Sequence, residues 1–278
     1  MTRTIAVALA TLALAGCGGG GGGAAGSPKT ELFDENVRQR LAALRAVGAA
    51  NGMRWNVFAK VGDSITASTH FLAPLGEGGY DLGDAPELRQ AIDFYGATPL
   101  PDGRNSFNRS AETAIGGWTA DDPLAAGGGC PGMTPLACEL SVIRPGVALV
   151  MFGTNDVQRG MVDRYEASLT AILDRLEGAG VAPVLFTIPP LAVATLAADV
   201  ARVNGIVARL ARERRLPLVD YGAAMAALPD RGLSADGVHP SVAPGGGGDL
   251  SASGLAYGYN LRNLMTLRML DALREVAP

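Results

Sequence analysis

Four short runs of consecutive hydrophobic residues punctuate the chain, and they lie at residues 56–61, 147–152, 182–188 and 216–221. Continuous hydrophobic runs, rather than strict alternation with polar residues, are typical of strands in a parallel sheet that is covered on both faces. The pattern therefore predicts a buried parallel sheet that contains these four strands.

The longer segments around the runs have the spacing of amphipathic helices, with hydrophobic residues every three or four positions. The expected helices cover residues 27–52, 163–178, 197–215 and 254–276. In the first of them, Ser27-Pro28 suits a helix start and Asn51-Gly52 suits a helix end. Strands that alternate with helices predict an α/β fold, a doubly wound parallel sheet in one domain.

Residues 68–146 break this rhythm, because they are rich in Gly, Pro and Asp and hold few hydrophobic runs. We expect an insertion of long loops here, with an edge strand near 105–111. Long structured loops commonly carry function or cover a site. The insertion is therefore expected to contribute to a functional site.

The N-terminal segment "MTRTIAVALATLALAGC" has one basic residue, Arg3, followed by a hydrophobic run and small residues. The run is shorter than the roughly 20 residues that span a membrane, and it fits a signal peptide. Its end, Leu14-Ala15-Gly16-Cys17, resembles the lipobox of bacterial lipoproteins, in which cleavage precedes a cysteine that then carries lipid. The alternative is an ordinary secretory signal with an incidental cysteine. The glycine tract that follows at once favours the lipoprotein, because it suits a flexible tether.

We therefore expect a signal peptide over residues 1–17, a tether over 18–29 and one folded domain over 30–278. The protein would be exported and anchored by lipid to the bacterial cell envelope, on its periplasmic or extracellular face. Two further cysteines, Cys130 and Cys138, bracket a short loop. Exported proteins usually oxidise such pairs, so we expect a disulfide.

Composition and charge exclude several classes of function. The 278 residues are 48% hydrophobic and 18% charged, with a net charge of −4, so the chain can bury a large core and is not of the disordered class. It has no long run of Lys or Arg, which leaves nucleic-acid binding without support. The cysteines and the two separated histidines lack the usual spacing of metal ligands, and no phosphate-binding glycine motif follows a strand. We expect no metal and no cofactor.

Polar residues follow the first two hydrophobic runs directly. Gly62-Asp63-Ser64 comes after the first, and Gly153-Thr154-Asn155-Asp156 after the second. Ligands of open α/β sheets bind beyond the carboxyl ends of the strands, so these residues are candidates for a site. A serine nucleophile needs a base, and the base needs an orienting carboxylate. Asp236 and His239, three residues apart in a turn, are suited to serve Ser64 in these roles.

An acyl-transfer site also needs hydrogen-bond donors for the oxyanion. The Asn155 amide and the backbone N–H groups of Ser64 and Gly117 are the candidates, with Gly116 as the alternative to Gly117. His70, the only other histidine, is interpreted as a surface residue.

These segments, in this order, resemble the SGNH (GDSL) hydrolases, whose Ser, Gly, Asn and His lie in four separate blocks. Here the blocks are "GDS", "GGWTA", "GTND" and "DGVHP". The resemblance covers most of residues 54–278 and implies a flavodoxin-like parallel sheet of about five strands. One position departs from the pattern: Glu112 stands five residues before Gly117, where the family often has Asn.

The resemblance also implies roles for the candidate residues. Ser64 would be the nucleophile, His239 the general base and Asp236 the orienting acid. Gly117, Asn155 and the Ser64 N–H would form the oxyanion hole. The protein would then be a serine esterase that hydrolyses carboxylic esters through an acyl-enzyme.

Two substrate classes fit such an esterase. One is O-acetyl groups on carbohydrate; the other is acyl esters of lipids, as in a lysophospholipase or lipase. Polar loops and few aromatic residues favour small acyl groups. An alternative of another class is a non-catalytic surface binding lipoprotein on the same fold, and the intact set Ser64, Asn155, Asp236 and His239 argues against it. The sequence predicts no oligomeric state.

Overall fold

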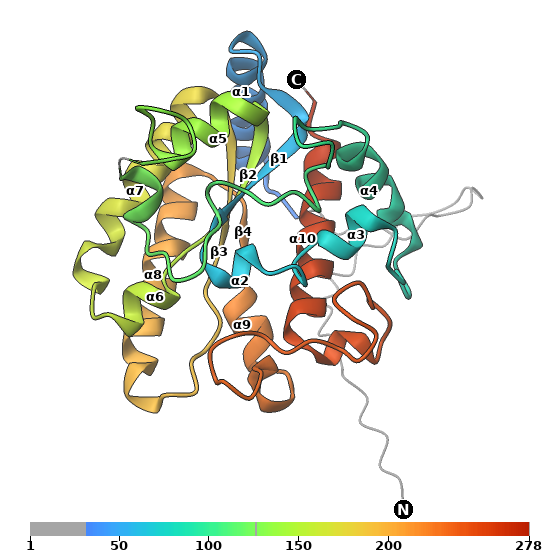
Figure 1. The fold of residues 1–278 in the computed structure, drawn as a ribbon, viewed down its shortest axis with the longest axis vertical. Coiled ribbons are helices and arrows are strands. Elements are labelled where there is room, and N and C mark those ends of the chain that lie inside the picture. The colour runs from blue at the N-terminus through green and yellow to red at the C-terminus, as the bar shows by residue number, and fades with distance from the viewer. Residues whose placement is uncertain (1–31, 126, 278) are drawn as a thin grey trace, which may run out of the picture. The chain divides into compact units, whose positions relative to one another are not determined.

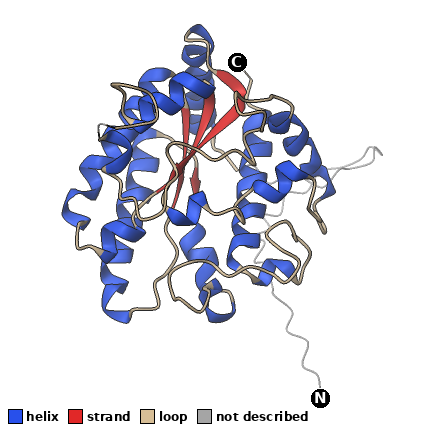
Figure 2. Cartoon of the chain, viewed as in Figure 1, coloured by secondary structure: helices blue, strands red, loops and turns tan. Residues whose placement is uncertain are grey.

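A parallel sheet of four strands lies at the centre of the residues that the computed structural model describes, 32–125 and 127–277 (Figures 1 and 2). The strands are β1 (Arg54–Gly62), β2 (Pro145–Met151), β3 (Ala182–Phe186) and β4 (Leu218–Val219). They neighbour one another in the order β1-β2-β3-β4, and every pair is parallel. All four hydrophobic runs thus form strands, and the α/β fold is confirmed. The predicted signal peptide, Cys17 and tether lie outside the described residues.

The sheet has fewer strands in its described part than the five or so expected. At the free edge of β1, a single parallel bridge joins Gly62 to Ala114. The Gly62 N–H donates to Thr113 O, and the Ile115 N–H donates to Gly62 O. The outer strand of a flavodoxin-like sheet is therefore reduced here to one bridge.

The prediction of an edge strand near 105–111 is wrong. That segment forms turns, and the Asn105 side chain accepts a hydrogen bond from the Phe107 N–H. Asn108 in turn accepts one from the Asn105 N–H. Such local bonds from Asn side chains compete with the ladder of a sheet, which explains why no strand forms.

Helices cover the sheet in two groups (Figure 1). The first group is α1 (Glu35–Ala50), α7 (Val162–Ala179) and α8 (Ala197–Arg214). Glu177 of α7 pairs with Arg40 of α1 and with Arg214 of α8, so one carboxylate links all three helices. The second group contains α4 (Arg89–Gly96) and α10 (Gly258–Arg274), which pack together. Within the described residues, none of the helices is both long and hydrophobic enough to cross a membrane.

The first expected helix is shorter than predicted. In the described part of the chain α1 begins at Glu35, because the Asp34 side chain caps it by accepting the Val37 N–H. Its end at Asn51 is as predicted. The proposed start at Ser27-Pro28 lies outside the described residues.

The segment 68–146 is not made of loops alone. It contains α3 (Ala73–Glu77), α4 and α5 (Pro135–Ile143), and it also holds two short 3-10 helices. Proline stands in the first turn of α3 and α5, where its fixed φ and missing N–H favour a helix start. These helices are too short to show a clear hydrophobic period in the sequence.

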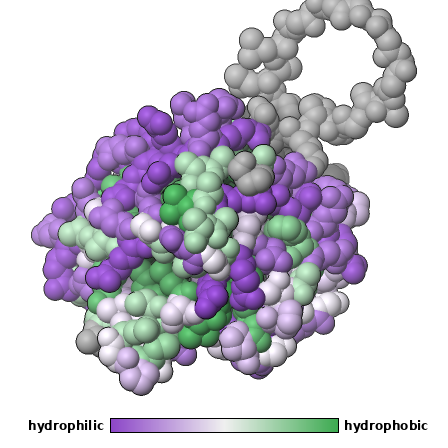
Figure 3. Space-filling view, turned by 90° about the horizontal axis from the view of Figure 1, so that it is seen from above, coloured by the Kyte–Doolittle hydropathy of each residue, from purple (hydrophilic) through white to green (hydrophobic). Residues whose placement is uncertain are grey.

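The end of the sheet opposite to Ser64 holds a cavity of about 530 Å³, lined in part by Arg54, Leu100 and Arg144. Arg54 begins β1 and Arg144 directly precedes β2, so this cavity lies at the amino ends of the strands. Figure 3 looks onto this end, where a hydrophobic area is bordered by hydrophilic residues. Ligands of such folds bind at the carboxyl ends, and the candidate site lies there.

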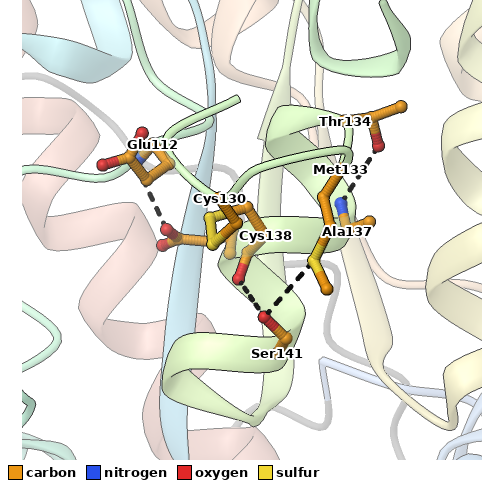
Figure 4. The surroundings of a disulfide bond; sticks show 8 residues. Glu112, Cys130, Met133, Thr134, Ala137, Cys138 and Ser141 are labelled. Carbon is orange, nitrogen blue, oxygen red and sulfur yellow. Dashed lines mark hydrogen bonds between the residues drawn. A yellow bond between two sulfur atoms is a disulfide. The ribbon is translucent and has the colours of Figure 1, made fainter. Parts of the chain in front are cut away.

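The predicted disulfide between Cys130 and Cys138 is confirmed (Figure 4). It ties the preceding loop to α5, whose first turn is capped by the Thr134 side chain. From the same helix, the buried Glu139 carboxylate accepts the Glu112 N–H at 3.2 Å. The disulfide-linked helix thus supports the chain segment that leads to Gly117.

Candidate active site

Ser64 is the first residue of α2 (Ser64–Ala67), which follows β1 directly. The Asp63 side chain caps this helix, with Oδ1 accepting the Ile65 N–H at 2.9 Å. A Cβ at Gly62 would lie 2.4 Å from Thr66 Oγ1 and 2.6 Å from Met151 O. Only glycine therefore permits this tight turn, and the "GDS" segment places the serine hydroxyl at the carboxyl end of the sheet.

His239 reaches Ser64 from a turn that precedes α10. Its Nε2 lies 2.8 Å from Ser64 Oγ, and its Nδ1 lies 2.7 Å from Asp236 Oδ2. The structure thus brings together the serine, histidine and aspartate that the sequence singled out. The side chains of His239 and Asp236 are 40% and 51% exposed, so the relay is open to solvent.

The Asp236 carboxylate is held by several donors. Burial would raise its pKa, but hydrogen bonds from the Val238 N–H, the His239 ring, the His239 N–H and the Ser234 hydroxyl together hold that pKa well below its usual range. Asp236 is therefore ionised at neutral pH. An ionised carboxylate at this position accepts the Nδ1 proton and leaves Nε2 free to accept from Ser64.

Asn155 lies in α6 (Thr154–Gln158), directly after β2. At Gly153, φ is +129° and a Cβ would lie 2.6 Å from Val203 Cγ1, so this turn requires glycine. The Asn155 amide donates to Trp118 O at 2.9 Å. One of its two N–H groups is thereby used to hold the "GGWTA" loop, and the second is available.

The neighbouring carboxylate of Asp156 also holds this loop. It is buried within α6 and accepts the Ala120 N–H at 3.2 Å. Burial raises the pKa of Asp156 to about 6, against the effect of that hydrogen bond. Asn155 and Asp156 of the "GTND" segment therefore both hold the "GGWTA" loop, one at Trp118 and the other at Ala120.

Gly116 lies beside the serine, and Gly117 follows it in the chain. A Cβ on Gly116 would lie 3.8 Å from Ser64 Cβ, and Gly117 has φ of +80°. Among the hydrogen bonds of the described residues, none uses the N–H of Ser64, Gly116 or Gly117. These unused backbone N–H groups are therefore the candidate donors for an oxyanion.

Arg262 of α10 packs against α2 and holds it by hydrogen bonds. The sequence patterns did not predict this role. The Arg262 guanidinium is buried and donates to Ile65 O at 2.8 Å and to Thr66 Oγ1 at 3.0 Å. It also stacks on Phe71, 3.7 Å from the ring centroid. An arginine at a core position of the last helix is the signal that was available, since arginine is rarely buried without a specific partner.

Asn263, next to Arg262, holds the loop after α2. Its side chain accepts the Leu72 N–H at 3.0 Å and donates to His70 O at 2.8 Å and Gly247 O at 2.9 Å. The polar residues of α10 thus fix α2, the loop that follows it and the segment around Gly247. The His70 side chain is exposed and its ring lies 5.7 Å from that of Tyr259, as expected of a surface histidine.

Asp63 is expected to make the stability depend on pH. Its burial raises the pKa to about 6, although the Ile65 N–H and the Arg262 charge oppose the shift. A carboxyl with a raised pKa in the folded state contributes stability that is complete below about pH 4 and is lost as pH rises through about 6.

Asp63→Asn keeps the acceptor for Ile65 but does not titrate. Its free energy of unfolding, relative to that of the wild type, should therefore increase by about 2–3 kcal/mol between pH 4 and pH 7. Urea denaturation of both proteins at several pH values measures the difference, in which the titration of other groups cancels. Parallel curves for the two proteins would show that Asp63 does not titrate in this range.

Comparison with known proteins assigns the family. The model of the GDSL-like lipase/acylhydrolase family matches residues 61–243, a range that includes all four blocks. The chain belongs to this family. It is therefore a hydrolase that acts on ester bonds. None of the curated proteins matches the chain.

Solved structures agree with the fold. A lipase/acylhydrolase from Enterococcus faecalis has a TM-score of 0.50 at 19% identity, covering 77% of this chain and 94% of that chain. An acetylxylan esterase from Geobacillus stearothermophilus has a TM-score of 0.50 at 21% identity, covering 77% and 93%. An acetyl esterase mutant solved with acetate has a TM-score of 0.51 at 19% identity, covering 77% and 97%. At these identities the likeness shows the shared fold.

Proposed function

We propose that this GDSL-family hydrolase is a serine esterase that works through an acyl-enzyme, with Ser64 as nucleophile. The observation that carries the proposal is the relay from Ser64 Oγ to His239 Nε2 at 2.8 Å and from His239 Nδ1 to Asp236 at 2.7 Å. His239 takes the hydroxyl proton as Ser64 attacks the ester carbonyl carbon. Asp236 fixes the tautomer and stabilises the imidazolium that forms.

The oxyanion of the tetrahedral intermediate would lie among the unused donors. These are the N–H groups of Ser64 and Gly117, or of Gly116, and the second amide N–H of Asn155. As the intermediate collapses, the C–O bond to the alcohol breaks and His239 protonates the leaving oxygen. Water then attacks the acyl-enzyme while His239 again accepts a proton. The bond between the acyl carbon and Ser64 Oγ breaks, His239 returns the proton to Ser64 Oγ, and the acid is released.

We infer that the substrate carries small acyl groups, acetyl above all, on carbohydrate. Low aromatic content, 5% of the chain, and the polar loops of the insertion support this over long lipid chains. The acetylxylan esterase and acetyl esterase among the similar structures are in line with it. A lysophospholipase or lipase activity is the alternative within the family.

A chain-length series of 4-nitrophenyl esters, together with acetylated oligosaccharides, tests the proposal on protein that lacks residues 1–17. Activity should be highest for acetyl esters and should fall with chain length. Activity that rises towards long acyl chains would instead support the lysophospholipase. Absence of turnover on every ester would support a non-catalytic binding protein on this fold.

We also propose that the protein is exported and that Cys17 carries a lipid anchor. Burial of each CH₂ group of an acyl chain contributes about 0.8 kcal/mol, so several chains would hold the protein at a membrane. Cys17→Ser should move the protein from the membrane fraction to the soluble fraction. Wild-type protein that is soluble and free of lipid by mass spectrometry would contradict the anchor.

A further inference from the structure

Arg159 stands at the edge of the candidate site. It follows the last residue of α6, its side chain is exposed, and its guanidinium donates to Gly117 O at 2.7 Å. The neighbouring Gly116 packs against Ser64. Arg159 therefore lies against the same short loop that supplies the candidate oxyanion donors.

The acidic residues of this region are already engaged. Asp121 pairs with Arg164 at 2.6 Å, and Asp122 Oδ2 accepts from Thr119. Asp156 accepts from the Ala120 N–H, as described above. Throughout the described part of the chain, no carboxylate lies within ion-pair distance of Arg159.

Most of the hydrogen-bonding capacity of Arg159 is thus unused. A guanidinium has five N–H donors in a planar fork that matches carboxylate and phosphate oxygens, and the bond to Gly117 occupies one of them. That bond also fixes one side of the guanidinium, so less side-chain freedom is lost when an anion binds to the other side. The chain as a whole carries a net charge of −4, so attraction of an anion to this site must come from a local cation.

We propose that Arg159 is a specificity-determining residue that binds an anionic group of the substrate, a carboxylate or a phosphate close to the ester. The inference rests on the proposed esterase function and extends it to the substrate class. An O-acetylated acidic saccharide would supply a carboxylate, and a lysolipid would supply a phosphate.

Two matched pairs of substrates test the proposal on protein that lacks residues 1–17. Acetylated methyl glucuronide is compared with acetylated methyl glucoside, and lysophosphatidic acid with the neutral monoacylglycerol of the same chain. The measured quantity is the ratio of kcat/KM for the anionic ester to that for the neutral ester. In the wild type this ratio should exceed one for at least one pair, and Arg159→Gln should lower it about tenfold, mainly through KM.

Two further variants separate charge from structure. Arg159→Lys keeps the charge but loses the fork, so it should retain part of the preference. Arg164→Gln removes an exposed arginine that already pairs with Asp121, so it should leave the ratio unchanged. High salt should weaken the preference of the wild type, since the anion would bind at an exposed charge.

The outcomes are distinct. A preference in the saccharide pair identifies a carboxylate, and one in the lipid pair identifies a phosphate; either supports the proposal if Arg159→Gln abolishes it. Ratios near one in the wild type, or a ratio that Arg159→Gln does not change, would overturn it while turnover of neutral esters still supports the esterase. Absence of turnover on all four esters would overturn the esterase function and this inference with it.

Discussion

Ser64→Ala and His239→Ala should each lower kcat by roughly 10³-fold or more, and the double variant should lose little beyond either single variant. The 2.8 Å contact between Ser64 Oγ and His239 Nε2 is the reason, because in the proposed mechanism the hydroxyl attacks only if the imidazole takes its proton. The two residues act as one unit, so their free-energy costs do not add. Steady-state kinetics on a chromogenic acetyl ester measures all three variants.

Labelling by an organophosphonate probe, followed by peptide mapping, supplies the direct check. The adduct should lie on Ser64 and should be absent from Ser64→Ala. Asp236→Asn should cost less than either substitution above, because Asp236 orients the ring without carrying the proton. His70→Ala serves as the matched histidine control and should leave kcat unchanged. Esterase activity that survives Ser64→Ala would contradict the nucleophile role and leave Ser64 with a structural role alone, as the first residue of α2.

Much of the fold could be predicted from the sequence because the sheet is buried on both faces. Every residue of β2 is buried, so its hydrophobic run has no polar interruption and is easily recognised. The blocks "GDS" and "GTND" were recognisable for a related reason. Their glycines, Gly62 and Gly153, stand where a Cβ would clash with neighbouring atoms, and the residues that follow stand at strand ends.

The parts that could not be predicted depend on contacts between distant segments. Arg262 holds α2 across 197 residues of sequence, and Asn263 holds the next loop across 193. The periodicity of a helix does not distinguish a buried polar residue such as Arg262 from an exposed one. Ala114 forms its bridge to β1 without a hydrophobic run of its own, because one bridge buries too little to require one. Long-range pairing, rather than local pattern, decides these features.

Asn155→Ala should lower kcat by about 10²–10³ with little change in KM, since the proposed oxyanion hole would lose one preorganised donor. The donor matters most when negative charge develops on the carbonyl oxygen, so the ground-state complex is affected less. The substitution also removes the 2.9 Å bond to Trp118 O. The loop nevertheless keeps two other attachments, the bond from Arg159 to Gly117 and the bond from Ala120 to Asp156.

Two comparisons separate the oxyanion role of Asn155 from support of the loop. Gln158→Ala, an exposed position on the same helix, should leave kcat unchanged. Asn155→Asp keeps the shape of the side chain but places an acceptor where the oxyanion forms, so it should be at least as damaging as Asn155→Ala. If Asn155→Ala instead keeps full kcat, the amide serves only to hold Trp118, and the backbone donors of Ser64 and Gly117 must stabilise the oxyanion alone.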